Sequence, residues 1–107
     1  MVETLTLFGG ILWLLIIGHF FVDYCLQSDW IAKNKGTDFY AMLGHTSAHA
    51  LFVYLVTGSY VLASAELICH TFIDTLKCDG RINIHKDQCL HIVCKVAWVF
   101  ILYKMVT

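Results

Sequence analysis

Four long apolar segments of this chain each carry two ionisable side chains spaced four residues apart. Residues four apart lie on the same face of an α-helix, so each pair forms a polar ridge on an otherwise apolar helix. The pairs are His19 and Asp23, His45 and His49, His70 and Asp74, and Asp87 and His91. One such pair is weak evidence for a site, whereas four in succession predict helices built around a shared polar cluster.

The composition is typical of an integral membrane protein. Hydrophobic residues make up 59% of the 107 residues and charged residues only 14%, with a mean hydropathy of +0.71. A chain of this length forms one domain, so we expect residues 1–107 to make a single integral membrane domain in the lipid bilayer. The net charge of −1 gives no basic surface, and we expect no nucleic-acid partner.

Hydropathy and turn signals predict an all-α fold, a four-helix transmembrane up-down bundle with a polar His/Asp site at one end. We interpret the first segment as a retained transmembrane helix, because no Lys or Arg precedes its apolar run and no cleavage site follows. The connection at 28–39 is expected to be a loop or a short interfacial helix. The expected helices span about residues 4–27, 40–56, 60–77 and 85–105.

The polar pairs lie late in the first and third helices and early in the second and fourth. In an up-down bundle all four pairs therefore meet at the same end. Basic residues also lie in or beside the two connections at this end, whereas the opposite end has only Lys104. The positive-inside rule then predicts a cell inner membrane protein with its site end in the cytoplasm and both termini outward. These basic residues are Lys33, Lys35, Lys77, Arg81 and Lys86.

Imidazole and carboxylate groups are the ligands that zinc, manganese and iron share. Ionisable groups within membrane helices are costly and usually face the bundle interior, where they have a function. The candidate ligands exceed what one tetrahedral ion needs, so they predict two ions, or one ion with further carboxylates that orient the imidazoles. The candidate ligands are His19, Asp23, His45, His49, His70, Asp74, Asp87 and His91.

Three residues are candidates for a catalytic role beside the metal: Asp23, Asp87 and Lys77. A metal at this end would activate water next to a phosphate or acyl group that enters at the level of the lipid headgroups. Lys33, Lys77 or Lys95 would neutralise the negative charge of such a substrate.

Other polar residues have supporting roles in this interpretation. Glu66 is either a further ligand or a buried partner of a histidine. Gln27 and Gln88 are expected to support the site through hydrogen bonds. The five cysteines fit reduced, packed thiols better than a disulfide framework; Cys94, three residues after His91, is the least certain of them.

The order of these motifs resembles an uncharacterised family of small bacterial and phage membrane proteins, catalogued as domain of unknown function 3307. The resemblance covers nearly the whole chain and implies that Gln27, Lys33, Lys77 and Gln88 belong to the site together with the eight candidate ligands. The family is distantly similar to membrane-bound metal-dependent hydrolases, which is an analogy and not evidence about the substrate. The stretches that carry the resemblance are HFFVDYCLQSDWIAKNK, LGHTSAHA, CHTFIDTLK and KDQCLH.

The leading functional hypothesis is a metal-dependent membrane hydrolase that acts at the cytoplasmic face on a phosphorylated or lipid-linked substrate. The adjacent His-Asp dipeptide of HD-type phosphohydrolases is absent, so that family is not assigned. A non-enzymatic metal binder or transporter, a haem protein, and a phage interaction factor acting on a host membrane protein remain alternatives. A homodimer packed through Gly9, Gly10 and Gly18 is a further prediction.

Overall fold

The structure is a computed structural model that describes all 107 residues, and every regular element in it is helical. The predicted all-α class is therefore confirmed. The long helices begin and end within about two residues of the predicted boundaries, once the π-helical segment is counted with the first helix. The elements are α1 (Val2–Phe20), the π-helical η1 (Phe21–Cys25), α2 (Asp29–Asn34), α3 (Phe39–Thr57), α4 (Tyr60–Cys78) and α5 (Ile84–Val106).

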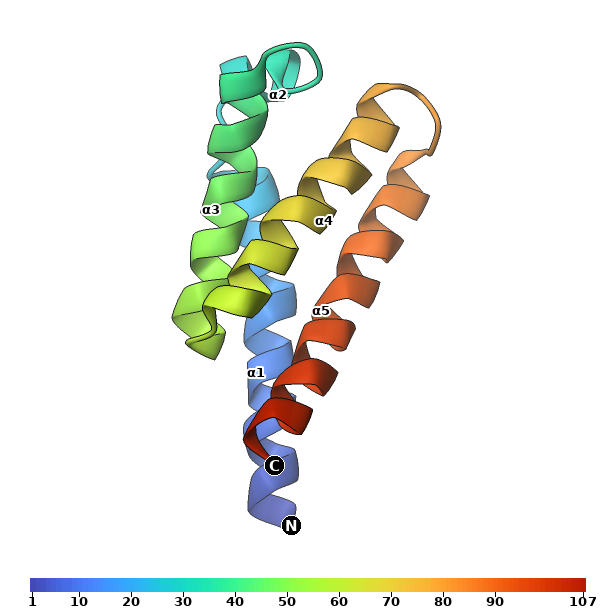
Figure 1. The fold of residues 1–107 in the computed structure, drawn as a ribbon. Helices are drawn as coiled ribbons and strands as arrows, with labels where there is room; N and C mark the ends of the chain where they lie inside the picture. The colour runs from blue at the N-terminus through green and yellow to red at the C-terminus, as the bar shows by residue number, and fades with distance from the viewer.

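The four long helices run alternately up and down and leave both termini at the same end of the molecule (Figure 1). The short helix α2 lies at the opposite end, between α1 and α3 in the chain. α3 packs along α4 and α1, and α5 packs along α4 and α1. The turn between α3 and α4 does not reach as far as the termini, so α1 and α5 extend beyond it (Figure 1).

Three segments are long and apolar enough to cross a membrane: Val2–Cys25, Phe39–Thr57 and Ile84–Val106. Three such segments in a chain of 107 residues are typical of a membrane protein. α4 is not among them, and it carries the ionisable residues Glu66, Asp74 and Lys77. That α4 also crosses the bilayer stays a prediction.

Local sequence signals explain where the helices begin and end. The residue before each of α2 to α5 has an extended backbone, and its side chain accepts a hydrogen bond from the backbone N–H three residues later. α3 ends at Gly58, whose φ of +69° is the left-handed conformation that favours glycine. The four capping residues are Ser28, Asp38, Ser59 and Asn83.

Packing of α1 against α3 depends on Gly18. A Cβ atom at this position would lie 1.8 Å from the Phe52 ring, so any other residue would force the ring or the helix to move. Gly18 is buried in this contact, which corrects the prediction that it is available to a second subunit. Gly9 and Gly10 have no atom within 4 Å of an added Cβ, and a homodimer through them stays a prediction.

Candidate metal centre

A π-helical turn introduces the first acidic ligand candidate. His19 lies near the end of α1, and Asp23 lies in the middle of η1, where the Leu26 N–H donates to the Phe21 carbonyl at 3.2 Å. Single π turns change the direction of the side chains that follow and are frequent at functional sites. Both His19 and Asp23 are buried, and 3.8 Å separates His19 Nε2 from Asp23 Oδ2.

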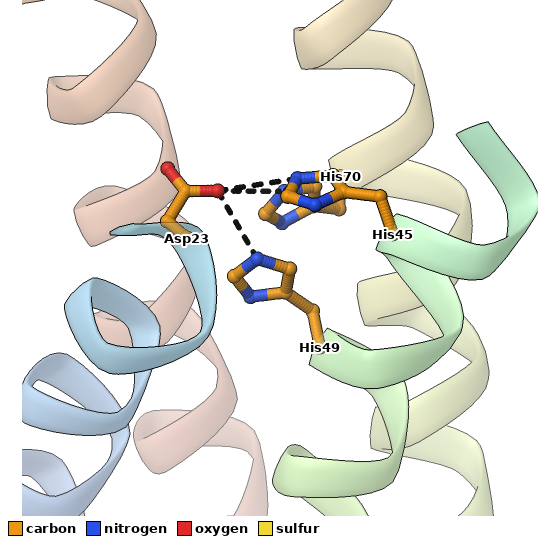
Figure 2. Close-up of side chains that lie close together, drawn as sticks. All are labelled: Asp23, His45, His49 and His70. Carbon is orange, nitrogen blue, oxygen red and sulfur yellow. Dashed lines mark hydrogen bonds and ion pairs between the residues drawn. The ribbon is translucent and has the colours of Figure 1, made fainter. Parts of the chain in front are cut away.

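The carboxylate of Asp23 faces three imidazoles from the neighbouring helices (Figure 2). Its Oδ1 atom lies 3.2 Å from Nε2 of His45, 3.2 Å from Nε2 of His49 and 3.8 Å from Nε2 of His70. The two histidines of α3 and the one of α4 thus direct their Nε2 atoms toward a single oxygen. All four side chains are buried, and their potential ligand atoms lie within 4.8 Å of one another.

A second group of ligand candidates joins α4 and α5. Nε2 of His91 lies 3.0 Å from Oδ1 of Asp74 and 3.3 Å from Oδ1 of Asp87. These three side chains are also buried, with potential ligand atoms within 4.8 Å of one another. The other oxygen of Asp74 lies 3.0 Å from Nε2 of His45. Asp74 therefore connects the two groups.

Gln88 links His19, the remaining ligand candidate, to both groups of ligand candidates. Its amide nitrogen donates to Oδ2 of Asp23 at 3.1 Å and to Oδ2 of Asp87 at 3.0 Å. Its amide oxygen lies 2.9 Å from Nε2 of His19. Ligand atoms of His19, His70 and His91 also lie within 4.8 Å of one another. The structure thus brings together all eight candidate ligands, called the polar cluster below, and gives Gln88 the supporting position expected for it.

Glu66 is a buried partner of a histidine, which decides between the two roles considered for it. Its Oε1 lies 3.3 Å from Nδ1 of His70 and also accepts from Lys95, and its Oε2 accepts from Nε1 of Trp98 at 2.8 Å. An Nδ1–H that donates to Glu66 leaves Nε2 of His70 unprotonated and directed into the polar cluster. Outer carboxylates orient metal-bound histidines in this way.

The lysines differ from the expectation. Lys35 lies closest to the cluster, with Nζ 3.4 Å from Oδ2 of Asp74. Lys95 is buried and paired with Glu66, so it is not available to a substrate. Lys33 is exposed, and Lys77 is half-buried without an ion pair or side-chain hydrogen bond, so its catalytic role stays a prediction.

Some of these supporting residues could have been found from the sequence. Asp87, His91, Lys95 and Trp98 follow one another at helical spacing, and all four are buried on one face of α5. The contact of Lys35 had no such signal, because the residue follows α2 in a connection without a periodic pattern. The prediction of packed thiols holds for two cysteines, Cys69 and Cys94, which pack against apolar residues, whereas Cys25, Cys78 and Cys89 are exposed.

With its histidines neutral, as metal ligands must be, the cluster has more negative than positive charge, and some of its polar atoms have no partner. Asp23, Asp74 and Asp87 are buried, and Lys35 is the only lysine that contacts them. Oδ1 of Asp87 and Nδ1 of His19 are buried and make no hydrogen bond. Buried groups of this kind are destabilising unless a partner satisfies them. A divalent cation would supply both the charge and the missing contacts, so the donor set fits a metal ion.

Comparison with known proteins gives one result. The family model described as "Protein of unknown function (DUF3307)" matches residues 11–107, a range that contains every residue of the polar cluster. This match confirms the resemblance to an uncharacterised family drawn from the motifs, whereas similarity to hydrolases and a bacterial or phage origin stay predictions. No curated protein and no solved structure matches the chain.

Proposed function

We propose a hydrolytic metal centre for this chain, which belongs to the DUF3307 family of proteins of unknown function. In this proposal the protein is a metal-dependent membrane hydrolase, and the polar cluster binds a divalent ion such as zinc, manganese or iron. One observation carries the proposal: eight buried histidine and aspartate side chains from four separate helical segments converge at one end of an apolar protein. Such ligands suit these metals and are costly to bury without a function.

The chemistry requires water to be activated and a proton to be moved. A bound divalent ion lowers the pKa of water and polarises a phosphoryl or carbonyl oxygen. In the hydrolysis the oxygen of water bonds to phosphorus or to the carbonyl carbon, the ester bond breaks, and the leaving oxygen takes up a proton. Asp87 is suited to hold the ion through Oδ1, which has no hydrogen-bond partner, and to pass a proton from water to the leaving oxygen through Oδ2.

The surroundings of the site support a phosphorylated or lipid-linked substrate. Exposed aromatic side chains lie on the segments next to the polar cluster, as is typical of a membrane–water interface. They include Tyr24, Trp30, Phe39 and Tyr40. In our proposal α4 completes a four-helix transmembrane bundle and the site lies at the cytoplasmic face of the inner membrane, which the basic connections beside it support.

The apolar part of the bundle supports an enzyme over a transporter. On the side of the polar cluster toward the termini, Leu15, Val53, Leu62 and Leu102 are buried against one another. None of the buried polar or charged side chains lies in this part of the bundle, and an ion moving through it would need such side chains along its path.

Elemental analysis of the detergent-purified protein tests the proposal first. We expect zinc, manganese or iron in the wild type, loss of this metal in His45→Ala/His49→Ala, and retention in His85→Ala. His85 is an exposed histidine at the start of α5, so it is a matched control. The metal-loaded protein should then hydrolyse phosphate monoesters or phospholipids in a screen, and a chelator should abolish this activity.

A wild type without metal after purification without chelators would overturn the proposal. The polar cluster would then be a buried hydrogen-bond network, as expected of an interaction factor. The other negative result is a protein that keeps its metal and hydrolyses none of the substrates. That result would identify it as a non-enzymatic metal binder.

A further inference from the structure

We infer that the polar cluster binds two divalent ions, bridged by the carboxylate of Asp74. The inference deepens the proposed function, because it concerns the metal content of the same site. In two-metal hydrolytic sites the ions are about 3.5–4 Å apart, and together they stabilise the attacking and the leaving oxygen. The arrangement of the donor atoms supports a pair of ions rather than one.

Two of the donor sets share no residue, and His19 lies beside both of them, in a third set with His70 and His91. The first set has four members, Asp23, His45, His49 and His70, and the second has three, Asp74, Asp87 and His91. Four protein ligands complete a tetrahedral metal site, whereas three leave a position open for water or substrate. The first set therefore leaves no open position at its ion, which Oδ2 of Asp74 would bind as a fifth ligand, whereas the second set would leave a position open for water or substrate.

Asp74 has the position required of a bridging ligand. Its Oδ2 faces the first set, at 3.0 Å from Nε2 of His45 and 3.4 Å from Nε2 of His70. Its Oδ1 faces the second set, at 3.0 Å from Nε2 of His91. A carboxylate whose two oxygens are directed to different groups of imidazoles can bind one ion with each oxygen.

The number of donors, and not the charge alone, requires the second ion. One divalent ion together with Lys35 would already balance the three aspartates. An ion in the first set, however, would leave Oδ1 of Asp87 without a hydrogen bond, and only a protonated His91, whose Nε2 lies at 3.3 Å, would give it a positive partner. A second ion would bind both groups and give the site a net positive charge, which attracts a phosphorylated substrate.

The test uses the full-length protein in detergent, loaded with Mn²⁺ and freed of excess metal. We expect two manganese equivalents per chain and an electron paramagnetic resonance signal of two spin-coupled ions. Asp87→Asn, which has nearly the same shape, should lose one equivalent and show the signal of an isolated ion. The control His85→Ala should keep both equivalents and the coupling. The spectrum of the wild type tests the inference even if a variant fails to fold.

One equivalent in the wild type, or two ions without spin coupling, would overturn the bridged pair. Metal content and turnover are separate measurements, so the two proposals can fail separately. Hydrolysis by a protein with a single ion would reject the pair and keep the enzyme. A coupled pair without hydrolysis of any substrate would support the pair and reject the enzyme. A protein without metal would overturn both.

Discussion

In the half of the molecule near the chain termini, the four long helices bury only apolar side chains, whereas in the half near α2 the same helices bury imidazoles and carboxylates beside a few apolar side chains. We call these the apolar half and the polar half. The change takes place within about one helical turn on every helix. It occurs between Leu15 and His19, between Val53 and His49, between Leu62 and Glu66, and between Trp98 and Lys95.

This difference separates stability from function within one set of helices. Packed apolar side chains hold the helices together through close contact, and they need no external partner. The polar half instead contains buried charges that are destabilising unless paired or bound to a cation. We therefore expect substitutions in the apolar half to change stability at constant metal content. Substitutions in the polar half should change metal binding, and they should change stability strongly only where a buried charge loses its partner.

The largest effect on stability is expected where the two halves meet, in Glu66→Gln. This substitution leaves the buried ammonium group of Lys95 without its carboxylate, and breaking a buried ion pair costs about 3–5 kcal/mol. It also weakens the support of His70 at Nδ1, so metal affinity should fall by about 10- to 100-fold. Unfolding by SDS, followed by circular dichroism, and metal titration measure the two effects.

A double variant separates these two effects. Glu66→Gln/Lys95→Met removes both charges, so the free energy of unfolding should recover while the metal affinity stays low. Recovery of both quantities would show that Glu66 serves only to neutralise Lys95 and does not orient His70.

The next largest effect is expected for Leu62→Ala in the apolar half. Leu62 is 1% exposed, and truncation of a buried leucine to alanine destabilises by about 2–5 kcal/mol through lost contacts and the cavity left behind. At saturating metal the number of bound ions should not change. Leu55→Ala, at a position that is 70% exposed, is the matched control and should unfold like the wild type. Loss of metal in folded Leu62→Ala would contradict the separation of the two halves.

The comparison of the apolar half with the polar half also explains which features could be predicted from the sequence. Hydropathy located the helices, and spacing within each helix located the polar pairs, because both are local properties of the chain. The convergence of the pairs followed from the up-down order of the helices. Contacts between helices had no local signal: nothing in the spacing showed that Asp74 faces both His45 and His91.

Two further features were beyond prediction for physical reasons. The π turn of η1 was not predicted, because nothing in the residues Phe21–Cys25 distinguishes it from a continued α-helix. The role of Gly18 was misassigned because a glycine on a membrane helix packs equally well against another subunit or against a helix of its own chain. Only the position of the Phe52 ring decides between these two roles.

Gly18→Ala should have a smaller effect, about 1–3 kcal/mol, because the added methyl group overlaps the Phe52 ring and forces α1 away from α3. The shift would also move His19 and Asp23, so metal affinity should fall with stability. Gly10→Ala is the control, since its methyl group would meet no atom within 4 Å. Phe52→Ala in the Gly18→Ala background should restore part of the stability. An additive loss in this double variant would show that the two residues do not compete for space.

The smallest effect on stability is expected for Lys35→Gln. The Lys35 side chain is 12% exposed and its ion pair with Asp74 spans 3.4 Å, but Asp74 keeps its contacts with three histidines, so the loss should cost about 1 kcal/mol or less. If Lys35 receives the negative charge of a substrate beside the metal, KM for a phosphorylated substrate should rise while the metal content stays the same. Steady-state kinetics at constant metal occupancy measure this change.

Lys33→Gln is the control for this last prediction, because it removes the same charge two residues away at an exposed position outside the cluster. An equal rise in KM for both variants would assign the effect to the general positive charge of the connection, which attracts anions at long range and weakens with added salt. A rise confined to Lys35→Gln and persisting at high salt would assign it to the contact with Asp74. Lys35, which no pattern in the sequence singled out, would then contact the substrate. The polar cluster would be a substrate-binding site as well as a metal site.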